Sequence, residues 1–220
     1  MTQKEILSHV DHTLLKPYST WDEIQKLCRE AIKYKTATVC IPPNYIKRVR
    51  EKFKKKLKIC TVVGFPLGYS SKEAKLVEII QALEDGADEI DMVVNISDVK
   101  NGEFNKIKQE ISLLKNSVDD KILKVIIETC YLNEDEKIKL CEIIKKTRAD
   151  YIKTSTGCGT AGAVLEDILL FKKHIGKEVK IKAAGGIRSI KDMETFLQAG
   201  CDRLGTSSAI ELFKAEETNK

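Results

Sequence analysis

A helix, a glycine and a strand follow one another in residues 82–90, ALEDGADEI, and again in residues 197–204, LQAGCDRL. In both segments the glycine stands where a helix typically ends, and apolar strand residues follow soon after it. Connections this short are typical of folds in which helices alternate with parallel strands. The two segments therefore predict a repeated helix–strand unit, and the sequence on either side continues the alternation.

Eight short apolar segments rich in β-branched residues alternate with amphipathic segments along the chain. The predicted strands cover residues 10–13, 36–41, 58–64, 89–95, 123–129, 151–156, 179–184 and 203–206. The predicted helices cover residues 20–34, 44–55, 71–85, 100–118, 133–146, 164–174, 189–198 and a short segment after 207. Thr20 and Ser71 are expected to cap two of these helices. The helix that follows Ser71 has an apolar face formed by Leu76, Ile79, Ile80 and Leu83.

Strict alternation without hairpins predicts a parallel sheet, and eight strands are the number that closes a (β/α)8 TIM barrel. We expect one domain spanning residues 1–220, because no linker or change of composition divides the chain. A doubly wound open sheet is the alternative, although the Gly-x-Gly-x-x-Gly fingerprint is absent after the first strand. A solenoid would require a uniform repeat length, and these units vary.

The composition is that of a globular protein, with 42% hydrophobic and 32% charged residues. The net charge of +5 is mild and the basic residues lie mostly on helical patterns without an aromatic stacking set, so no nucleic-acid partner is expected. The N-terminus lacks an apolar signal core and no long uncharged apolar stretch occurs, which predicts a cytoplasmic protein without a membrane partner. Seven cysteines without a Cys-x-x-Cys pair indicate a reducing compartment.

Two lysines lie within predicted strands, each just before a glycine-rich turn: Lys153 and Lys182. Because side chains alternate between the faces of a strand, both lysines are predicted to point inward. Burial of an ammonium group is costly unless it is paired or needed for chemistry. Two neighbouring lysines would lower each other's pKa, and a neutral amine is a nucleophile for carbonyl groups. Lys180 lies nearer the start of its strand and is expected to contact solvent or a carboxylate.

Asp91 lies between two apolar residues in the predicted strand 89–95, on the same face as Val93 and Asn95. A single strand aspartate or lysine is more often structural than functional. Asp91, Lys153 and Lys182 together, at corresponding places in one barrel, indicate a catalytic site.

Eight of the 12 glycines lie at or after position 157, and glycine-rich turns follow the seventh and eighth predicted strands. Backbone N–H groups at a helix start bind phosphate, and barrels commonly hold phosphate in the loops after these two strands. The turns therefore indicate a phosphate site, although glycines in tight turns alone would also explain them.

Seven phrases, in order along residues 9–210, resemble the deoxyribose-phosphate aldolase family of class I aldolases, which have a (β/α)8 barrel. They are VDHTLLKP at 10–17, VCIP at 39–42, VVGFPLG at 62–68, EIDMVVN at 89–95, IKTSTG at 152–157, KAAGGIR at 182–188 and RLGTSS at 203–208. The phrases that contain the two lysines are highly specific.

The resemblance implies roles by position. Lys153 matches the lysine that forms the Schiff base, Lys182 the second lysine that lowers its pKa and helps to move protons, and Asp91 the carboxylate of the proton relay. The phosphate-binding positions match Gly157, Gly185, Gly186, Gly205, Ser207 and Ser208, with Arg188 close by. Positions near the pocket, to which we assign no chemistry, match Asp11, Thr13 and Cys40.

The reaction implied by the resemblance is reversible cleavage of 2-deoxy-D-ribose 5-phosphate to acetaldehyde and D-glyceraldehyde 3-phosphate. The expected partner is thus a small phosphorylated sugar, with no cofactor and no metal, in a homo-oligomeric dimer or tetramer. Two departures stand out: Cys158 occupies a position where some members have a lysine, and the tail at 216–220 lacks the terminal tyrosine of some members. The alternatives are a phosphosugar isomerase with Asp91 as base and a non-catalytic phosphometabolite-binding protein.

Overall fold

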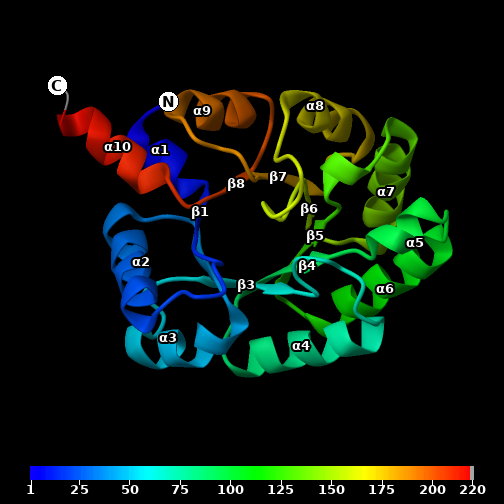
Figure 1. Ribbon diagram of the computed structural model, residues 1–220, viewed down its shortest axis with the longest axis horizontal. Helices are drawn as coiled ribbons and strands as arrows, with labels where there is room; N and C mark the ends of the chain where they lie inside the picture. The colour runs from blue at the N-terminus through cyan, green and yellow to red at the C-terminus, as the bar shows by residue number, and fades with distance from the viewer. Residues whose placement is uncertain (219–220) are drawn as a thin grey trace.

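The computed structural model describes residues 1–218 and contains a closed barrel of eight parallel strands in sequential order (Figure 1). The strands are β1 Val10–Thr13, β2 Thr38–Ile41, β3 Ile59–Val63, β4 Glu89–Val93, β5 Ile122–Ile126, β6 Tyr151–Lys153, β7 Lys180–Ala184 and β8 Arg203–Thr206. β8 pairs with β1, so no strand edge is left open. The predicted (β/α)8 TIM barrel is confirmed.

The helices form a ring outside the barrel (Figure 1). They are α1 Gln3–Ser8, α2 Trp21–Tyr34, α3 Ile46–Phe53, α4 Lys72–Glu84, α5 Ile96–Lys100, α6 Phe104–Ser117, α7 Glu134–Thr147, α8 Leu165–His174, α9 Ile190–Gln198 and α10 Ala209–Thr218, with 3-10 turns η1 Pro43–Tyr45 and η2 Thr129–Tyr131. Within residues 1–218 none of them is long and apolar enough to cross a membrane.

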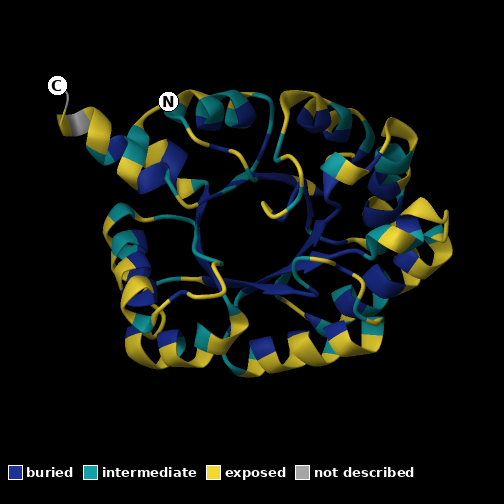
Figure 2. Cartoon of the chain, in the orientation of Figure 1, coloured by how far each residue is buried: buried dark blue, intermediate teal, exposed yellow. Residues whose placement is uncertain are grey.

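Figure 2 shows that the strands are almost entirely buried while the helices expose their outer faces. The main apolar core lies between the outer surface of the barrel and the inner faces of the helices, where residues such as Ile24, Ile111 and Phe171 are inaccessible to solvent. Burial on both sides is typical of parallel sheets and explains the near-continuous apolar strand sequences.

The helix starts follow the predicted capping chemistry. Thr20 forms a capping box with Glu23, and the Ser71 side chain accepts a hydrogen bond from the Ala74 amide. Both contacts satisfy amides that the first helical turn leaves unpaired.

Several predicted boundaries were wrong by two or more residues. β5 ends at Ile126 and not at residue 129, because Glu128 adopts a left-handed conformation and starts a 3-10 turn. β6 ends at Lys153 and not at residue 156, because the chain turns at Gly157, which has a φ of 87°. The predicted helix 100–118 begins only at Phe104, as α6. The short helix α5 before it was not predicted, and Gly102, with a φ of 71°, separates the two.

The buried face of α4 differs from the predicted one. Ile79 is buried, but Ile80 is 45% exposed and Lys75 is fully buried. The Lys75 ammonium donates to Glu110 Oε1 at 2.6 Å and to the Val93 carbonyl at 2.8 Å. Apolar periodicity alone does not predict a lysine at this position, because its burial depends on a partner from another helix.

We expect Lys75→Met to lower the free energy of unfolding by about 3–5 kcal/mol, because Glu110 would remain buried without its charged partner. Chemical denaturation followed by circular dichroism measures the change. The matched control is Lys72→Met on the same helix, whose side chain is 41% exposed and whose expected effect is within about 0.5 kcal/mol. Equal effects of the two substitutions would contradict a stabilising role for the buried pair.

Candidate active site

Lys153, Lys182 and Asp91 meet inside the barrel, as the strand alternation predicts. Lys153 and Lys182 are register partners on β6 and β7. Both ammonium groups donate to the same oxygen of Asp91, on β4: the Nζ–Oδ2 distances are 2.7 Å from Lys153 and 2.6 Å from Lys182. The three side chains therefore form one hydrogen-bonded unit across the barrel.

Further charged side chains from other strands bind to this unit. Lys124, on β5, donates to Asp91 Oδ1 at 2.8 Å and lies 2.6 Å from Glu89. Asp11, on β1, accepts a hydrogen bond from Lys182 and one from Arg203, on β8, at 2.5 Å. Arg203 also contacts Glu89 at 3.1 Å. The barrel interior is thus a continuous ionic network and not an apolar core.

The network holds four cationic side chains and three carboxylates. Among the described residues, Lys153 has a single carboxylate within 4 Å, and it shares that carboxylate with two other lysines. Its side chain is also 4% exposed, whereas those of Lys182 and Lys124 are fully buried. A buried unpaired charge is unfavourable, so Lys153 is the cation of the network with the least compensation from carboxylates.

The pKa values of Lys182 and Asp91 are shifted in the directions that favour their charged forms. Burial alone would lower the pKa of Lys182, but the carboxylates of Asp11 and Asp91 outweigh burial and raise that pKa above its ordinary value. Burial raises the pKa of Asp91, yet Lys124, Lys153 and Lys182 hold it well below the ordinary value. The expectation that the two lysines lower each other's pKa is therefore wrong for Lys182, because the nearby carboxylates dominate.

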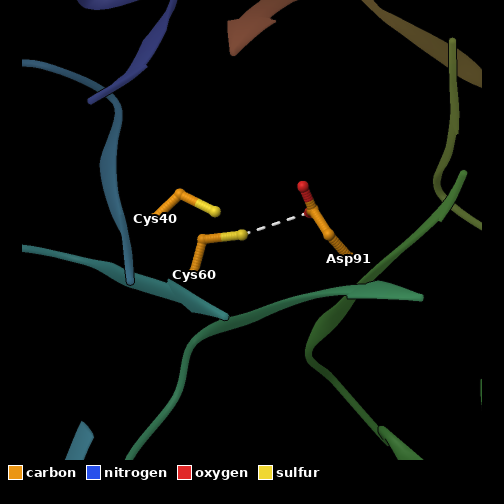
Figure 3. Close-up of side chains that lie close together, drawn as sticks. All are labelled: Cys40, Cys60 and Asp91. Atoms are coloured by element: carbon orange, nitrogen blue, oxygen red, sulfur yellow. Dashed lines mark hydrogen bonds between the residues drawn. The ribbon is translucent and has the colours of Figure 1, made fainter. Parts of the chain in front are cut away.

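Two cysteines lie against the same carboxylate (Figure 3). The Cys60 thiol donates to Asp91 Oδ1 at 3.1 Å, and Cys40 is its register partner on the neighbouring strand. Burial raises the pKa of Cys60 well above its ordinary value, whereas the neighbouring Cys60 side chain lowers the pKa of Cys40. The donor atoms of the three residues lie within 4.8 Å of one another and are suitable ligands for a soft divalent metal. The Lys124 ammonium, however, contacts Cys60 at 3.3 Å and already supplies a positive charge there.

A cavity of about 720 Å³ opens at the carboxyl ends of the strands. It is lined by all seven residues predicted to bind phosphate: Gly157, Gly185, Gly186, Arg188, Gly205, Ser207 and Ser208. Cys158, the departure from the family pattern, is exposed and also lines the cavity. The cations on its wall are thus Arg188 and Lys16, and the latter received no role from the sequence.

The turns after β7 and β8 have the geometry of an anion site. Gly185 and Gly186 have φ values of 80° and 73°, a left-handed region that other residues rarely adopt. Within residues 1–218, the amides of Gly186 and Ser207 donate to no protein acceptor. Free amides on two turns that line the same cavity are suitable donors to an anion.

Gly205 is required for a different reason. A Cβ atom at this position would lie 3.2 Å from Lys182 Cε and 3.0 Å from Ala184 Cβ. The glycine therefore makes room for the Lys182 stem in addition to lining the cavity.

The sequence interpretation missed part of the charged network: it did not mark Lys124, Glu89 and Arg203, and it assigned no chemistry to Asp11. A signal existed for Lys124, because it lies between apolar neighbours in β5 as Lys153 and Lys182 do in their strands. Glu89 and Arg203 begin their strands, where charged residues are usually solvated, so no local pattern marked them. Lys180 is exposed, as predicted, and its ammonium lies 5.7 Å from the centre of the Tyr151 ring.

Several known proteins are similar to this chain over nearly its full length. Residues 6–207 match the model of the DeoC/LacD family of aldolases. A deoxyribose-phosphate aldolase of Clostridium botulinum (strain Alaska E43 / Type E3) is 63% identical over 99% of both chains, and one of Clostridioides difficile is 59% identical over 98% of both. The deoxyribose phosphate aldolase of Aeropyrum pernix, described as tetrameric, has a TM-score of 0.89 at 31% identity over 100% of this chain and 94% of its own. Matches of this extent leave one conclusion: the chain belongs to the DeoC/LacD family of aldolases, and it is a lyase.

Proposed function

We propose that this aldolase cleaves 2-deoxy-D-ribose 5-phosphate reversibly to acetaldehyde and D-glyceraldehyde 3-phosphate through a Schiff base on Lys153. The observation that carries the proposal is the position of Lys153, whose amine shares an Asp91 oxygen with Lys182 at the end of the strand that leads into the cavity-lining turn at Thr156–Cys158. The names of the most similar relatives support the choice of substrate.

The charge balance of the barrel supports Lys153 as the nucleophile and Lys182 as its charged partner. Lys182 has two carboxylate partners, whereas Lys153 shares its one carboxylate. A permanent ammonium beside Lys153 favours the neutral form of Lys153, which is the form that attacks a carbonyl carbon.

The chemistry follows from an amine next to proton donors and acceptors. The Lys153 amine adds to the aldehyde carbon of the open-chain sugar, and loss of water gives an iminium ion. The positive iminium accepts the electron pair of the breaking carbon–carbon bond, which forms an enamine and releases D-glyceraldehyde 3-phosphate. Asp91 and Lys182 move the protons of these steps; protonation of the enamine and addition of water then release acetaldehyde and restore the amine.

The turns at Gly185–Gly186 and at Ser207 hold the phosphate in this proposal, with Arg188 as a charged donor. A phosphate held at one end of the cavity fixes the distance from the aldehyde carbon to Lys153, which favours the reactive geometry. Acetaldehyde carries no phosphate group, so only the sugar phosphate and the three-carbon product make this interaction.

The direct test measures acetaldehyde release from 2-deoxy-D-ribose 5-phosphate with a coupled alcohol dehydrogenase. Borohydride added together with substrate reduces the iminium, and peptide mass spectrometry should locate the added carbon chain on Lys153. An isomerase would not form an iminium, and a binding protein would release no acetaldehyde. A lack of acetaldehyde release by the folded protein would refute the proposal.

The cellular setting follows from the same proposal. We place the enzyme in the cytoplasm, in the degradation of deoxyribose phosphate, as a homo-oligomer. The tetrameric relative from Aeropyrum pernix supports the last point, and sedimentation of the purified protein tests it.

We expect Arg188→Ala to raise KM for the 5-phosphate about 10-fold and to change kcat little, because a charge-assisted hydrogen bond to phosphate is lost from both bound states. Steady-state kinetics measures both constants. Lys191→Ala is the matched control, because Lys191 is exposed on the same segment but does not line the cavity. A fall in kcat with unchanged KM would contradict a binding role for Arg188.

A further inference from the structure

Glu128 lies just after β5 and has a backbone conformation that is rare for glutamate. Its φ and ψ are 50° and 67°, in the left-handed region, and its side chain is buried. In residues 1–218 four other non-glycine residues have a positive φ, and all four are exposed at or just after helix ends: Lys35, Lys54, Asp119 and Arg148. A strained conformation that persists at a buried position suggests a local function.

The Glu128 carboxylate holds the backbone that follows β6. It accepts the Thr156 amide at 3.1 Å and also accepts the Thr156 hydroxyl proton. The same hydroxyl oxygen accepts a hydrogen bond from the Cys158 amide at 3.0 Å. Because a hydroxyl has one proton, its donation to Glu128 leaves its lone pairs free to accept the Cys158 N–H.

These hydrogen bonds fix the turn that carries Gly157, which has a φ of 87°. Thr156, Gly157 and Cys158 all line the 720 Å³ cavity, whereas Glu128 does not. The loop also passes closely over the carboxylate, because a Cβ atom at Gly159 would lie 3.2 Å from Glu128 Cδ. Glu128 therefore supports one wall of the cavity from behind.

We propose that Glu128 is a positioning residue that sets the affinity of the cavity for the substrate phosphate through the Thr156–Gly157–Cys158 turn. The inference rests on the proposed function, in which a phosphate ester occupies this cavity. Glu128 acts through Thr156 and touches neither the phosphate nor Lys153. Its loss should weaken recognition of the phosphorylated end of the substrate and leave the lysine chemistry intact.

The test compares Glu128→Ala and Glu128→Gly with the wild type on two substrates. For 2-deoxyribose 5-phosphate we expect KM to rise about 30-fold with kcat nearly unchanged, and for unphosphorylated 2-deoxyribose kcat/KM should change less than about 3-fold. Glycine accepts a positive φ, so Glu128→Gly should melt at a higher temperature than Glu128→Ala while its KM stays equally high. Recovery of KM in Glu128→Gly would show that Glu128 acts only through stability and would overturn the proposal.

A second measurement uses inorganic phosphate, whose binding requires no turnover. Titration calorimetry should show a dissociation constant for phosphate about 10-fold higher in Glu128→Ala than in the wild type, and an unchanged constant in Glu134→Ala, an exposed acid on α7. An equal loss of activity on both sugars, or an unchanged phosphate affinity in Glu128→Ala, would overturn the inference. A wild type that binds phosphate but releases no acetaldehyde from the 5-phosphate would refute the proposed function alone.

If both truncated variants fail to fold, Glu128→Gln tests whether Glu128 sets the affinity for phosphate. The amide has the same size and can still accept the Thr156 N–H, but its NH₂ group replaces the oxygen that accepts the Thr156 hydroxyl proton. We expect the dissociation constant for phosphate to rise about 5-fold. An unchanged constant in this variant would overturn the proposal.

Discussion

Replacement of Lys153 by alanine is expected to lower kcat/KM by about 10⁴-fold or more, because no other group can form the iminium in its place. The other lysines of the barrel cannot substitute for it: Lys182 and Lys124 are fully buried and bound to carboxylates. The coupled assay for acetaldehyde measures the loss, and borohydride should no longer fix substrate carbon to the protein.

Lys180→Ala is the matched control for this prediction. Lys180 also lies in a barrel strand, but its side chain is exposed, and its ammonium lies 5.7 Å from the centre of the Tyr151 ring. Its activity should stay within about 3-fold of the wild type. Retained activity in folded Lys153→Ala protein would refute the assignment of the nucleophile.

Lys182→Leu is expected to lower kcat by about 10²–10³-fold and to move the acidic limb of the pH–rate profile to higher pH. Lys182 carries a permanent positive charge, since Asp11 and Asp91 raise its pKa despite the opposing effect of burial. Its removal leaves the Asp91 oxygen that both lysines share to Lys153 alone, so the Lys153 ammonium is stabilised. A higher pH is then needed to produce the neutral amine.

The profile of kcat/KM against pH, measured for the variant and for Lys180→Leu, separates this effect from a general loss of activity. The control removes a lysine from the same strand and should keep the wild-type profile. A lower rate with an unmoved acidic limb would mean that Lys182 moves protons but does not tune Lys153. An unchanged rate and profile would exclude both roles.

The local pattern of the sequence was sufficient to predict the barrel. Eight alternating units, with caps such as Thr20 and glycine stops such as Gly86, specify helices and strands through interactions within a few residues. Errors occurred where a distant contact or a single backbone angle decides the outcome. α5 was missed because its five residues are too few to show a helical period, and Lys75 was not expected in the core because its partner Glu110 lies 35 residues away.

The candidate site could be predicted in part. Lys153, Lys182 and Asp91 were identified because each interrupts an apolar strand, and strand alternation gives the direction of a side chain. Their joint contact at one oxygen, and the Asp11 and Glu89 carboxylates that hold the other cations, could not be predicted. Those contacts join strands that lie far apart in the chain.

The sequence by itself determined the order of the elements, the inward direction of the two lysines and the glycine-rich turns, because each depends on local conformation and side-chain period. Only the tertiary structure decided which cations form ion pairs with several carboxylates. It also decided that Lys153 has one carboxylate partner, which it shares with other lysines. The physical reason is that the charge state of a buried amine depends on every ionised group within a few ångströms. Closure of the barrel brings the charged groups of the network together from six strands.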